Sequence, residues 1–584
     1  MHPYQDPSRP TGDRVADLLS RMTLEEKAGL MFHTMLAMND DGTPVEEPGA
    51  QPGGRTTTEM LQGGLLNHFN LLGGGAPAAM ARWHNRVQEI AADTRLGIPV
   101  TLSTDPRHAF TDNPGAGLPS GAFSRWPEAT GLAAIGDPDE VRRHADIVRR
   151  EYLAVGLRVA LHPQIDLATE PRWPRVSGTF GASAELTSRL VAAYIEGMRG
   201  PAFGPESVAC MVKHFPGGGP QRDGEDPHFP YGREQVYPGG AFDYHLEPFR
   251  AALAAGATQV MPSYGMPVGT GYEEVGFGFN ERVITGLLRG GLGFDGIVCT
   301  DWCLLNETRI GPFLEPAKAW GAEHLTPLER AEKALRAGVD QFGGESCPEL
   351  VVELARSGRI PEDRIDASVR RLLREKFRLG LFEHRYADPD RAEEIVGNAG
   401  FAAAGNAAQR RSLTLLTNKD VLPVGDRPRL YVEGVDPGRA AAYAEVVDSP
   451  DRADLAVLRL PAPFEPREGG FFETFFHSGS LEFPPDRVRE IVELLDRLPT
   501  VVAINLERPA AVPEIAAHAA ALIGEYGASD EAVLDVVFGR ARPEGRLPFE
   551  LPRSMAEVEG SRSDVPGDTA DPVFPLGHGL SLET

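Results

Sequence analysis

The chain has 584 residues, 41% of them hydrophobic, which is enough for two or three domains with buried cores. Its formal net charge of -26 opposes binding to nucleic-acid phosphates and to anionic lipid, so we expect neither partner. The sequence contains no run of about 18 apolar residues, and we therefore expect no membrane-spanning helix.

The chain begins with MHPYQDPSRP, a segment that is polar and interrupted by prolines. It lacks the apolar stretch of a secretory signal peptide. We therefore expect a cytoplasmic protein.

The cysteines are Cys210, Cys299, Cys303 and Cys347, all in or beside apolar segments. A zinc site with Cys299 and Cys303 as one ligand pair is the alternative, but no Cys-x-x-Cys spacing or clustered histidine accompanies them. We expect buried, reduced thiols, and neither a metal nor a cofactor.

Between about residues 95 and 345, short apolar runs alternate with amphipathic helices. The runs are apolar on both faces, which is typical of strands buried in a parallel sheet. The predicted strands are 98–105, 159–168, 208–215, 258–265, 296–302 and 338–344. The predicted helices are 183–200, 243–256, 280–291, 323–338 and 364–382.

Polar residues and glycines delimit these helices. The expected N-caps are Ser183, Asp243 and Asn280, and the terminal glycines are Gly200, Gly256 and Gly338. The alternation predicts an α/β fold with a (β/α)8 barrel of the TIM type, which we assign to residues 1–386.

A second α/β pattern follows residue 400. Its predicted strands are 430–435, 453–460, 500–506 and 520–526, and its predicted helices are 488–498 and 530–539. This pattern predicts an open sheet with helices on its faces, an α/β sandwich domain of residues 401–584. The polar segment 387–400 is assigned as the linker.

Polar residues recur where the apolar runs of the predicted barrel end. They are Asp105, Lys213 with His214, Tyr264 and Asp301. One such residue is usually a helix cap or a solvated loop residue. In a barrel, however, these strand ends meet at one face, which is where barrel enzymes carry their active sites.

Asp301 is the strongest single candidate, because it ends the run IVCT and precedes Trp302. A carboxylate there can attack the anomeric carbon of a sugar, and the indole can stack on the sugar ring. The alternative is a structural aspartate that caps the next segment.

Basic residues near these strand ends are candidates for binding sugar hydroxyls. Lys213 and His214 can also keep a nearby carboxylate ionised, or have little functional value. Arg172, in EPRWPR, either offers its fork of donors to vicinal hydroxyls or forms an ion pair with Glu170.

The segments GIPVTLSTD, DLATEPRWPR, KHFPGGG, VMPSYG and GFDGIVCTDW stand in the order and rough spacing of glycoside hydrolase family 3. The chain resembles this family over about residues 10–584, most specifically in KHF and GFDGIVCTDW. The resemblance implies a barrel plus an α/β sandwich, with the active site between them. It also implies hydrolysis that retains anomeric configuration through a covalent glycosyl-enzyme.

The resemblance implies a role for each candidate. Asp301 corresponds to the nucleophile of the (S/T)DW motif, and Trp302 to a stacking wall. The implied sugar-binding residues are Asp105, Arg172, Lys213, His214 and Tyr264. Two motifs depart from the family, since D-x-V-H-G reads DPRHAF and FGED reads FGAS here, which puts the loop shape around the sugar in question.

The general acid/base of the family's glucosidases is a glutamate on a loop of the second domain. The corresponding region is AVLRLPAPFEPREGGFFETFFHSGSLEF, residues 456–483. Glu465 follows the strand soonest and is our assignment, with Glu468 and Glu473 as alternatives.

The family's N-acetylglucosaminidases instead resemble KHFPG-x-G-x4-D-[ST]-H, whose histidine is the acid/base. This chain reads KHFPGGGPQRDGEDPH, which ends in His228 with two extra residues and a proline in place of Ser/Thr. We therefore predict a β-glucosidase, with a β-xylosidase or a β-N-acetylglucosaminidase as alternatives.

Many of these side chains are candidates for binding the hydroxyls of a single sugar ring. So many groups around one ring indicate a closed pocket, and we therefore predict exo-acting cleavage of a small carbohydrate. A non-catalytic carbohydrate-binding protein on the same fold is a further alternative. The presence of Asp301 together with Lys213 and His214 argues against it. The oligomeric state stays open, and a homo-oligomer is compatible with the sequence.

Overall fold

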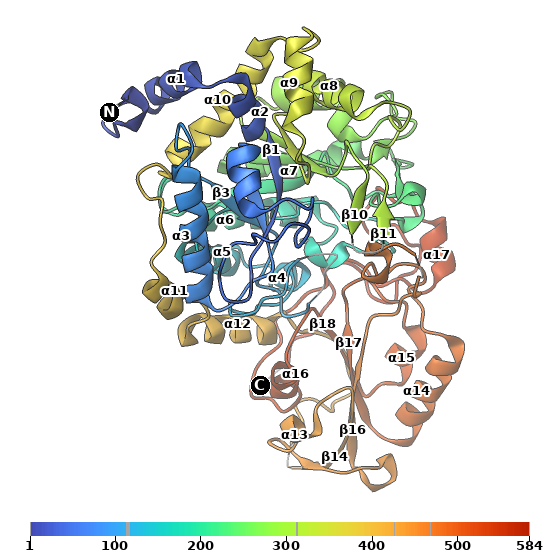
Figure 1. The fold of residues 1–584 in the computed structure, drawn as a ribbon. Helices are drawn as coiled ribbons and strands as arrows, with labels where there is room; N and C mark the ends of the chain where they lie inside the picture. The colour runs from blue at the N-terminus through green and yellow to red at the C-terminus, as the bar shows by residue number, and fades with distance from the viewer. Residues whose placement is uncertain (1, 113–116, 311–312, 426, 468, 583–584) are drawn as a thin grey trace.

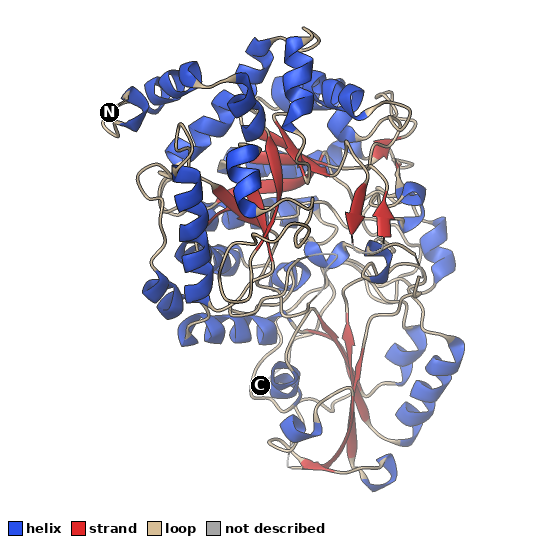
Figure 2. Ribbon diagram, in the orientation of Figure 1, coloured by secondary structure: helices blue, strands red, loops and turns tan. Residues whose placement is uncertain are grey.

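The structure is a computed structural model that describes residues 2–112, 117–310, 313–425, 427–467 and 469–582. Strands of the first part form a barrel surrounded by helices, and a second sheet lies beyond one end of it (Figures 1 and 2). The fold confirms the predicted barrel followed by an α/β sandwich domain.

Eight parallel strands close the barrel in the order β1-β12-β9-β7-β5-β4-β3-β2. They are β1 Phe32–Ala37, β2 His68–Leu72, β3 Thr101–Thr104, β4 Leu157–Ala160, β5 Ala209–Phe215, β7 Gln259–Pro262, β9 Ile297–Trp302 and β12 Gln341–Gly343. Five of these strands fall within the predicted runs, and β4 overlaps the run 159–168 but begins two residues before it. β1 and β2 were not predicted, because buried His33, His68 and Asn70 interrupt their apolar pattern.

Helices cover the outside of the barrel. They are α1 Thr11–Arg21, α2 Leu24–Leu30, α3 Pro77–Ala92, α4 Ala129–Ile135, α5 Pro138–Ala154, α6 Ala184–Arg199, α7 Phe242–Ala255, η7 Arg282–Gly291, α8 Pro327–Ala337, α9 Pro348–Arg356 and α10 Glu362–Arg378. The Ser183 hydroxyl caps α6 by accepting from Leu186 N, as predicted. The predicted cap at Asp243 is wrong, because α7 already begins at Phe242.

Shorter elements decorate the loops of the barrel. The helical turns are η1 Pro3–Gln5, η2 Glu59–Gly63, η3 Val176–Gly178, η4 Arg222–Gly224, η5 Pro230–Gly232 and η6 Phe277–Phe279. The short strands are β6 Glu234–Gln235, β8 Met266–Pro267, β10 Thr308–Ile310 and β11 Phe313–Glu315. β10 and β11 form an antiparallel hairpin beside the second domain (Figure 1).

The second sheet has the order β13-β18-β17-β16-β14-β15, with β13 antiparallel to β18 and the other neighbours parallel. Its strands are β13 Thr414–Asn418, β14 Arg429–Glu433, β15 Glu445–Val446, β16 Leu455–Leu460, β17 Thr500–Asn505 and β18 Ala521–Glu525. Its helices are α12 Ala399–Ser412, α13 Pro437–Ala440, η8 Pro450–Arg452, η9 Phe472–Thr474, α14 Pro485–Arg497, α15 Pro513–His518, α16 Asp530–Val537 and α17 Met555–Gly560.

Alternate residues of this second sheet face two apolar cores. Val502 and Ile504 of β17 pack in one core with α14 and α15. Val501 and Ala503 pack in the other core with α16. The four predicted strands are confirmed, whereas the short edge strand β15 and the antiparallel edge strand β13 were not predicted.

The segment predicted as the linker, 387–400, contains α11 Pro389–Ile395 and the first residues of α12. Ala392 and Val396 are buried in the same apolar cluster as the barrel helices. The segment is therefore packed against the barrel over much of its length. The domain limits 1–386 and 401–584 stay a prediction.

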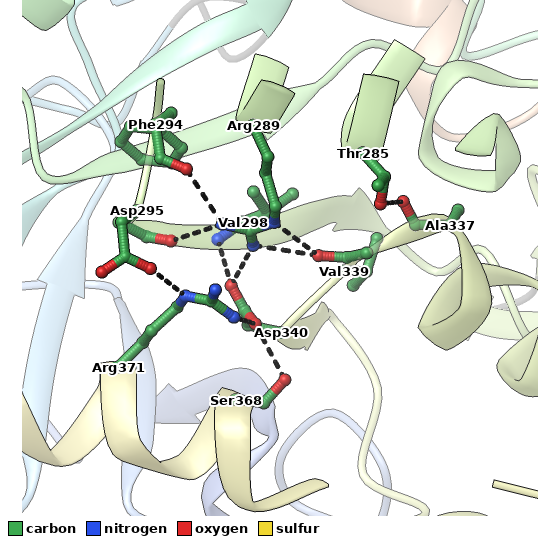
Figure 3. A network of polar contacts seen from close by, with 12 residues as sticks. Thr285, Arg289, Phe294, Asp295, Val298, Ala337, Val339, Asp340, Ser368 and Arg371 are labelled. Atoms are coloured by element: carbon green, nitrogen blue, oxygen red, sulfur yellow. Dashed lines mark hydrogen bonds and ion pairs between the residues drawn. The ribbon is translucent and has the colours of Figure 1, made fainter. Parts of the chain in front are cut away.

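A polar network ties together the amino ends of β9 and β12 (Figure 3). Asp340, which directly precedes β12, is fully buried and accepts hydrogen bonds from Val298 N and Ser368 Oγ at 3.0 and 2.8 Å. Arg289 and Arg371 also donate to its carboxylate, at 2.6 and 3.0 Å. Polar groups at this end of a barrel stabilise the fold, whereas those at the opposite end carry the chemistry.

Among the described residues, no helix combines the length and the apolar character needed to cross a bilayer. Cys210, Cys299 and Cys303 are buried and Cys347 is half-buried, all as free thiols. The cytoplasmic location and the oligomeric state stay predictions.

Candidate active site

The predicted barrel residues gather at the carboxyl ends of the strands. Asp105 directly follows β3, Lys213 and His214 lie near the end of β5, and Tyr264 follows β7. Asp301 and Trp302 end β9, and Arg172 lies in the loop after β4. The closed barrel brings these ends together, because its strands are parallel.

The two oxygens of Asp301 have different environments. The side chain is buried, and Oδ1 accepts a hydrogen bond from Trp302 N at 2.9 Å. Oδ2 has no hydrogen-bond partner among the described residues, and His214 Nε2 lies 3.8 Å from it. A buried oxygen without a partner is costly to folding, which marks Oδ2 as an atom kept free for function.

His214 is oriented by Asp166, a residue that was not predicted. Nδ1 of His214 lies 2.8 Å from Asp166 Oδ2, and Asp166 Oδ1 accepts from the backbone N–H groups of His214 and Gly218. Burial raises the pKa of Asp166, but His214 and these hydrogen bonds outweigh it and hold the pKa below its ordinary value. The ionised Asp166 therefore turns Nε2 of His214 towards Asp301. The sequence did contain a signal for this residue, because an aspartate stands inside the apolar run 159–168.

Arg175 is a second residue that sequence reasoning missed. Its Nη1 lies 3.1 Å from His214 Nε2, and its side chain is buried. The guanidinium donates to Nε2 of His214 and so helps to fix the imidazole that faces Asp301. The motif EPRWPR contains both Arg172 and Arg175, and spacing alone does not reveal which one faces the strand ends.

Arg172 makes the ion pair that was the alternative to sugar binding. Its Nε and Nη2 donate to the two oxygens of Glu170, each at 2.9 Å. The bidentate geometry fixes the guanidinium beside the mouth of the barrel. The role of Arg172 in binding a sugar stays a prediction.

Asp105 and Lys213 form an ion pair at the same face. Lys213 Nζ donates to Asp105 Oδ1 at 3.0 Å, and Asn70 Nδ2 of β2 donates to Asp105 Oδ2 at 3.1 Å. Burial raises the pKa of Asp105, but the ammonium and these hydrogen bonds outweigh it, so the pKa lies below the ordinary value. The ionised carboxylate can accept hydrogen bonds from sugar hydroxyls.

Tyr264 and Trp302 form an aromatic wall beside Asp301. The Tyr264 hydroxyl donates to Trp302 O at 2.7 Å. Burial, followed by the charge of Asp301, raises the pKa of Tyr264 well above its ordinary value, so the phenol stays neutral. The ring of His33 from β1 meets the Trp302 indole edge-on at 5.4 Å.

The structure brings His228, the rival acid/base, against this wall. Its ring lies 4.9 Å from that of Tyr264, and its Nδ1 lies 2.6 Å from Asp226 Oδ1. Burial lowers the pKa of His228, and Asp226 acts in the opposite direction. Phe472 and Phe476 of the second domain lie 5.7 and 5.0 Å from the same ring.

Two of the three candidate loop glutamates belong to the described residues, and Glu468 lies outside them. Glu473 Oε1 accepts from Tyr231 Oη at 2.6 Å and Oε2 from Gly470 N at 2.9 Å, so its carboxylate is engaged. The Glu465 side chain is exposed, while its backbone N–H donates to Ser478 O at 2.9 Å. The acid/base role of Glu465 stays a prediction.

Contacts from the barrel hold the loop that carries these glutamates. Arg467 donates to both oxygens of Glu225 at 2.6 and 2.7 Å. Phe471 N donates to Glu315 of β11 at 3.2 Å. The loop of the second domain therefore lies over the barrel face that carries Asp301.

A separate cavity of about 80 Å3 lies beside Lys213. Its lining includes His108, His144 and Glu128, but neither Asp301 nor His214. We place the site at the strand ends rather than in this cavity, because the free carboxylate oxygen lies there.

Comparison with known proteins identifies the family. The sequence profile described as "Glycosyl hydrolase family 3 N terminal domain" matches residues 60–375, and that of the "Glycosyl hydrolase family 3 C-terminal domain" matches residues 319–582. The chain belongs to glycoside hydrolase family 3. It is therefore a glycoside hydrolase, as its sequence predicted.

Relatives of high identity span almost the whole chain. "Beta-glucosidase C" of Emericella nidulans is 52% identical over 587 residues, which cover 99% of this chain and 94% of that protein. "Periplasmic beta-glucosidase/beta-xylosidase" of Dickeya chrysanthemi is 41% identical over 605 residues, 99% of this chain and 91% of that protein.

Solved structures share the fold at lower identity. A β-glucosidase from Erythrobacter marinus has a TM-score of 0.80 at 22% identity and covers 99% of this chain and 84% of its own. The β-glucosidase from Listeria innocua in complex with glucose has a TM-score of 0.77 at 22% identity, with 98% and 83% covered.

Proposed function

We propose that the protein is a retaining, exo-acting β-glucosidase that removes terminal β-D-glucosyl residues through a covalent glycosyl-enzyme. The observation that carries the proposal is the buried, unpartnered Oδ2 of Asp301 at the carboxyl end of β9. Family membership and the names of its relatives support the same substrate class.

The groups around Asp301 suit the attack of a carboxylate on a sugar. Asp301 Oδ2 attacks the anomeric carbon, and His214, held by Asp166 and Arg175, lies beside the attacking oxygen. Asp105 and Lys213 bind hydroxyls of the same ring. Glu465 protonates the departing oxygen and then activates water, the two tasks of the second carboxyl group in a retaining enzyme.

Replacement of the nucleophile tests the proposal directly. Asp301→Asn should fold but lose at least about 10⁴-fold in turnover of an aryl β-glucoside, because the amide is not a nucleophile. A 2-deoxy-2-fluoro glucoside should label the wild-type peptide that contains Asp301, as read by mass spectrometry. The exposed Asp363→Asn serves as the control and should stay active.

Label on another carboxylate, or near-normal turnover by Asp301→Asn, would contradict the assignment. Release of glucose alone from a reduced oligosaccharide checks the exo-acting mode. Mainly internal fragments would contradict it.

A β-N-acetylglucosaminidase is the second candidate, because His228 packs on Tyr264 and is paired with Asp226. If Glu465 is the acid/base, Glu465→Ala should slow glucosides with poor leaving groups most, and azide should restore turnover of activated ones. His228→Ala is the matched variant. Azide rescue of His228→Ala, with Glu465→Ala like wild type, would instead favour the second candidate.

Substrate preference separates the remaining alternatives. A panel of aryl β-glucoside, xyloside, galactoside and N-acetylglucosaminide should show the highest kcat/KM for the glucoside. The 41% identical relative, named for both glucosidase and xylosidase, makes the xyloside the most informative comparison.

A further inference from the structure

Arg508 is a fully buried cation between the two domains. It lies just beyond β17, in the sequence LERPA, and is 0% exposed. Its Nη1 donates to Arg172 O at 2.9 Å and to Gly479 O at 3.2 Å. Its Nη2 donates to Pro463 O at 2.7 Å and, more weakly, to Ser478 O and Ser480 O at 3.4 Å.

These carbonyls belong to three segments that meet at Arg508. Pro463 and residues 478–480 form the two stems of the loop that carries Glu465. The stems are also paired by the hydrogen bond from Glu465 N to Ser478 O. The third segment is the barrel loop of Arg172, which leads to Arg175 beside His214.

Burial of a guanidinium that binds carbonyls rather than a paired carboxylate costs free energy of folding, because the charge loses its hydration. Burial lowers the pKa of Arg508 to about 10, so the group stays charged at neutral pH. The carboxylates of Glu507, Glu465 and Glu170 act in the opposite direction. An apolar side chain of similar size would fill the space, but it would leave the carbonyls of two loops without their donor.

We propose that Arg508 is a positioning residue that fixes the loop of Glu465 against the barrel loop of Arg172 and thereby sets the geometry of proton transfer. The proposal rests on the acid/base role of Glu465 proposed above. Glu465 lies two residues beyond Pro463, so a shift of the stem moves its carboxyl group directly.

The positioning matters in both chemical steps. In the first, the acid gives its proton to the glycosidic oxygen while Asp301 attacks, and the C1–O bond breaks with its electron pair on that oxygen. In the second, the same carboxylate takes a proton from water as the water oxygen attacks C1 and releases Asp301. Misplacement by about 1 Å can cost about 100-fold in such a step.

The effect should depend on the leaving group. For Arg508→Lys, kcat/KM should fall by about 100-fold for glucosides with poor leaving groups, which need protonation, and by less than about 5-fold for activated aryl glucosides. Azide should partly restore turnover of the activated substrates. Rates are expressed per active site titrated with the 2-deoxy-2-fluoro glucoside, so that unfolded protein does not count.

Arg508→Met is the second variant, and Arg459→Lys is the matched control. Arg459 of β16 also lies in the second domain, and its side chain binds Glu525 and Asp530 rather than the loop of Glu465. The control should retain wild-type dependence on the leaving group. If Arg508→Met fails to fold, Arg508→Lys alone decides the question.

Glu465→Ala measured in parallel separates the two proposals. If Glu465→Ala lacks leaving-group selectivity and azide rescue, the proposed acid/base is wrong, and so is the positioning role that rests on it. If Glu465→Ala shows both effects but the folded Arg508 variant loses the same factor on all glucosides, Arg508 is structural and the positioning role alone is overturned.

Discussion

At the residue scale, the two oxygens of Asp301 are distinguished by their neighbours. Oδ1 is held by the backbone N–H of Trp302, while Oδ2 faces His214 and has no donor among the described residues. The asymmetry fixes the carboxyl plane through one oxygen and leaves the other free to form a bond. Arg175 contacts the His214 ring that faces this free oxygen, so it belongs to the site although its place in the sequence does not indicate this.

Arg175→Met should lower kcat/KM for an aryl β-glucoside by about 100-fold, because the preorganised cation that holds His214 next to the reacting carboxylate is lost. Arg459→Met is the matched variant, since Arg459 lies in the second domain and is paired with Glu525 and Asp530. Steady-state kinetics with a thermal-unfolding control provide the measurement. An equal loss in both variants would contradict the special place of Arg175.

Sequence alone could find the site residues that end apolar runs, such as Asp301 and Lys213, because parallel strands bring their ends to one face. It could not find Asn70, which lies on a strand too polar to be recognised. Arg175 was missed for a different reason. Which of two arginines in one loop faces inwards depends on contacts with His214, 39 residues away in the chain.

At the element scale, the register of β9 and β12 depends on Asp340. Its carboxylate binds the β9 backbone at Val298 N and also Arg289 and Arg371, of which Arg371 has a second partner in Asp295. The predicted run 338–344 included this aspartate without assigning it a role. Its function in the fold appears only once β9, η7 and α10 are placed around it (Figure 3).

Asp340→Asn should lower the free energy of unfolding of the barrel by about 3 kcal/mol, because the partly buried Arg289 is left with an uncompensated charge. The exposed Asp295→Asn, which removes another partner of Arg371, should cost less than about 1 kcal/mol. Denaturant unfolding followed by tryptophan fluorescence reports the barrel, since all 5 tryptophans lie between residues 83 and 320. Similar midpoints for the two variants would contradict the prediction.

At the scale of the whole molecule, the two domains share a hydrophobic core. Trp173 and Val176 of a barrel loop belong to the same buried cluster as Leu458 and Val502 of the second sheet. Hydrogen bonds also cross the junction, including Glu128 N to Tyr526 O at 2.8 Å. The sequence predicted both domains, but it could not predict this junction, because residues distant in the chain form it.

Glu128 makes the junction sensitive to pH. Burial raises the pKa of its carboxyl group to about 8, and Glu507 and Glu525 of the second domain act in the same direction. The folded protein therefore holds this proton more tightly than the unfolded chain does. The resulting stability is fully present below about pH 4.5 and is lost as the pH rises towards 8, at up to about 1.4 kcal/mol per pH unit.

Glu128→Gln keeps the side chain neutral at every pH and should remove this loss. The variant should therefore unfold at a higher temperature than wild type at pH 8.5, whereas the two should differ little near pH 4.5. Thermal unfolding across this range is the measurement, and the exposed Glu185→Gln is the control, expected to follow wild type. Parallel curves for wild type and Glu128→Gln would mean that Glu128 ionises at no cost to the junction. A convergence of the curves only at low pH would instead show that protonation of one buried carboxyl group helps to hold the second domain on the barrel.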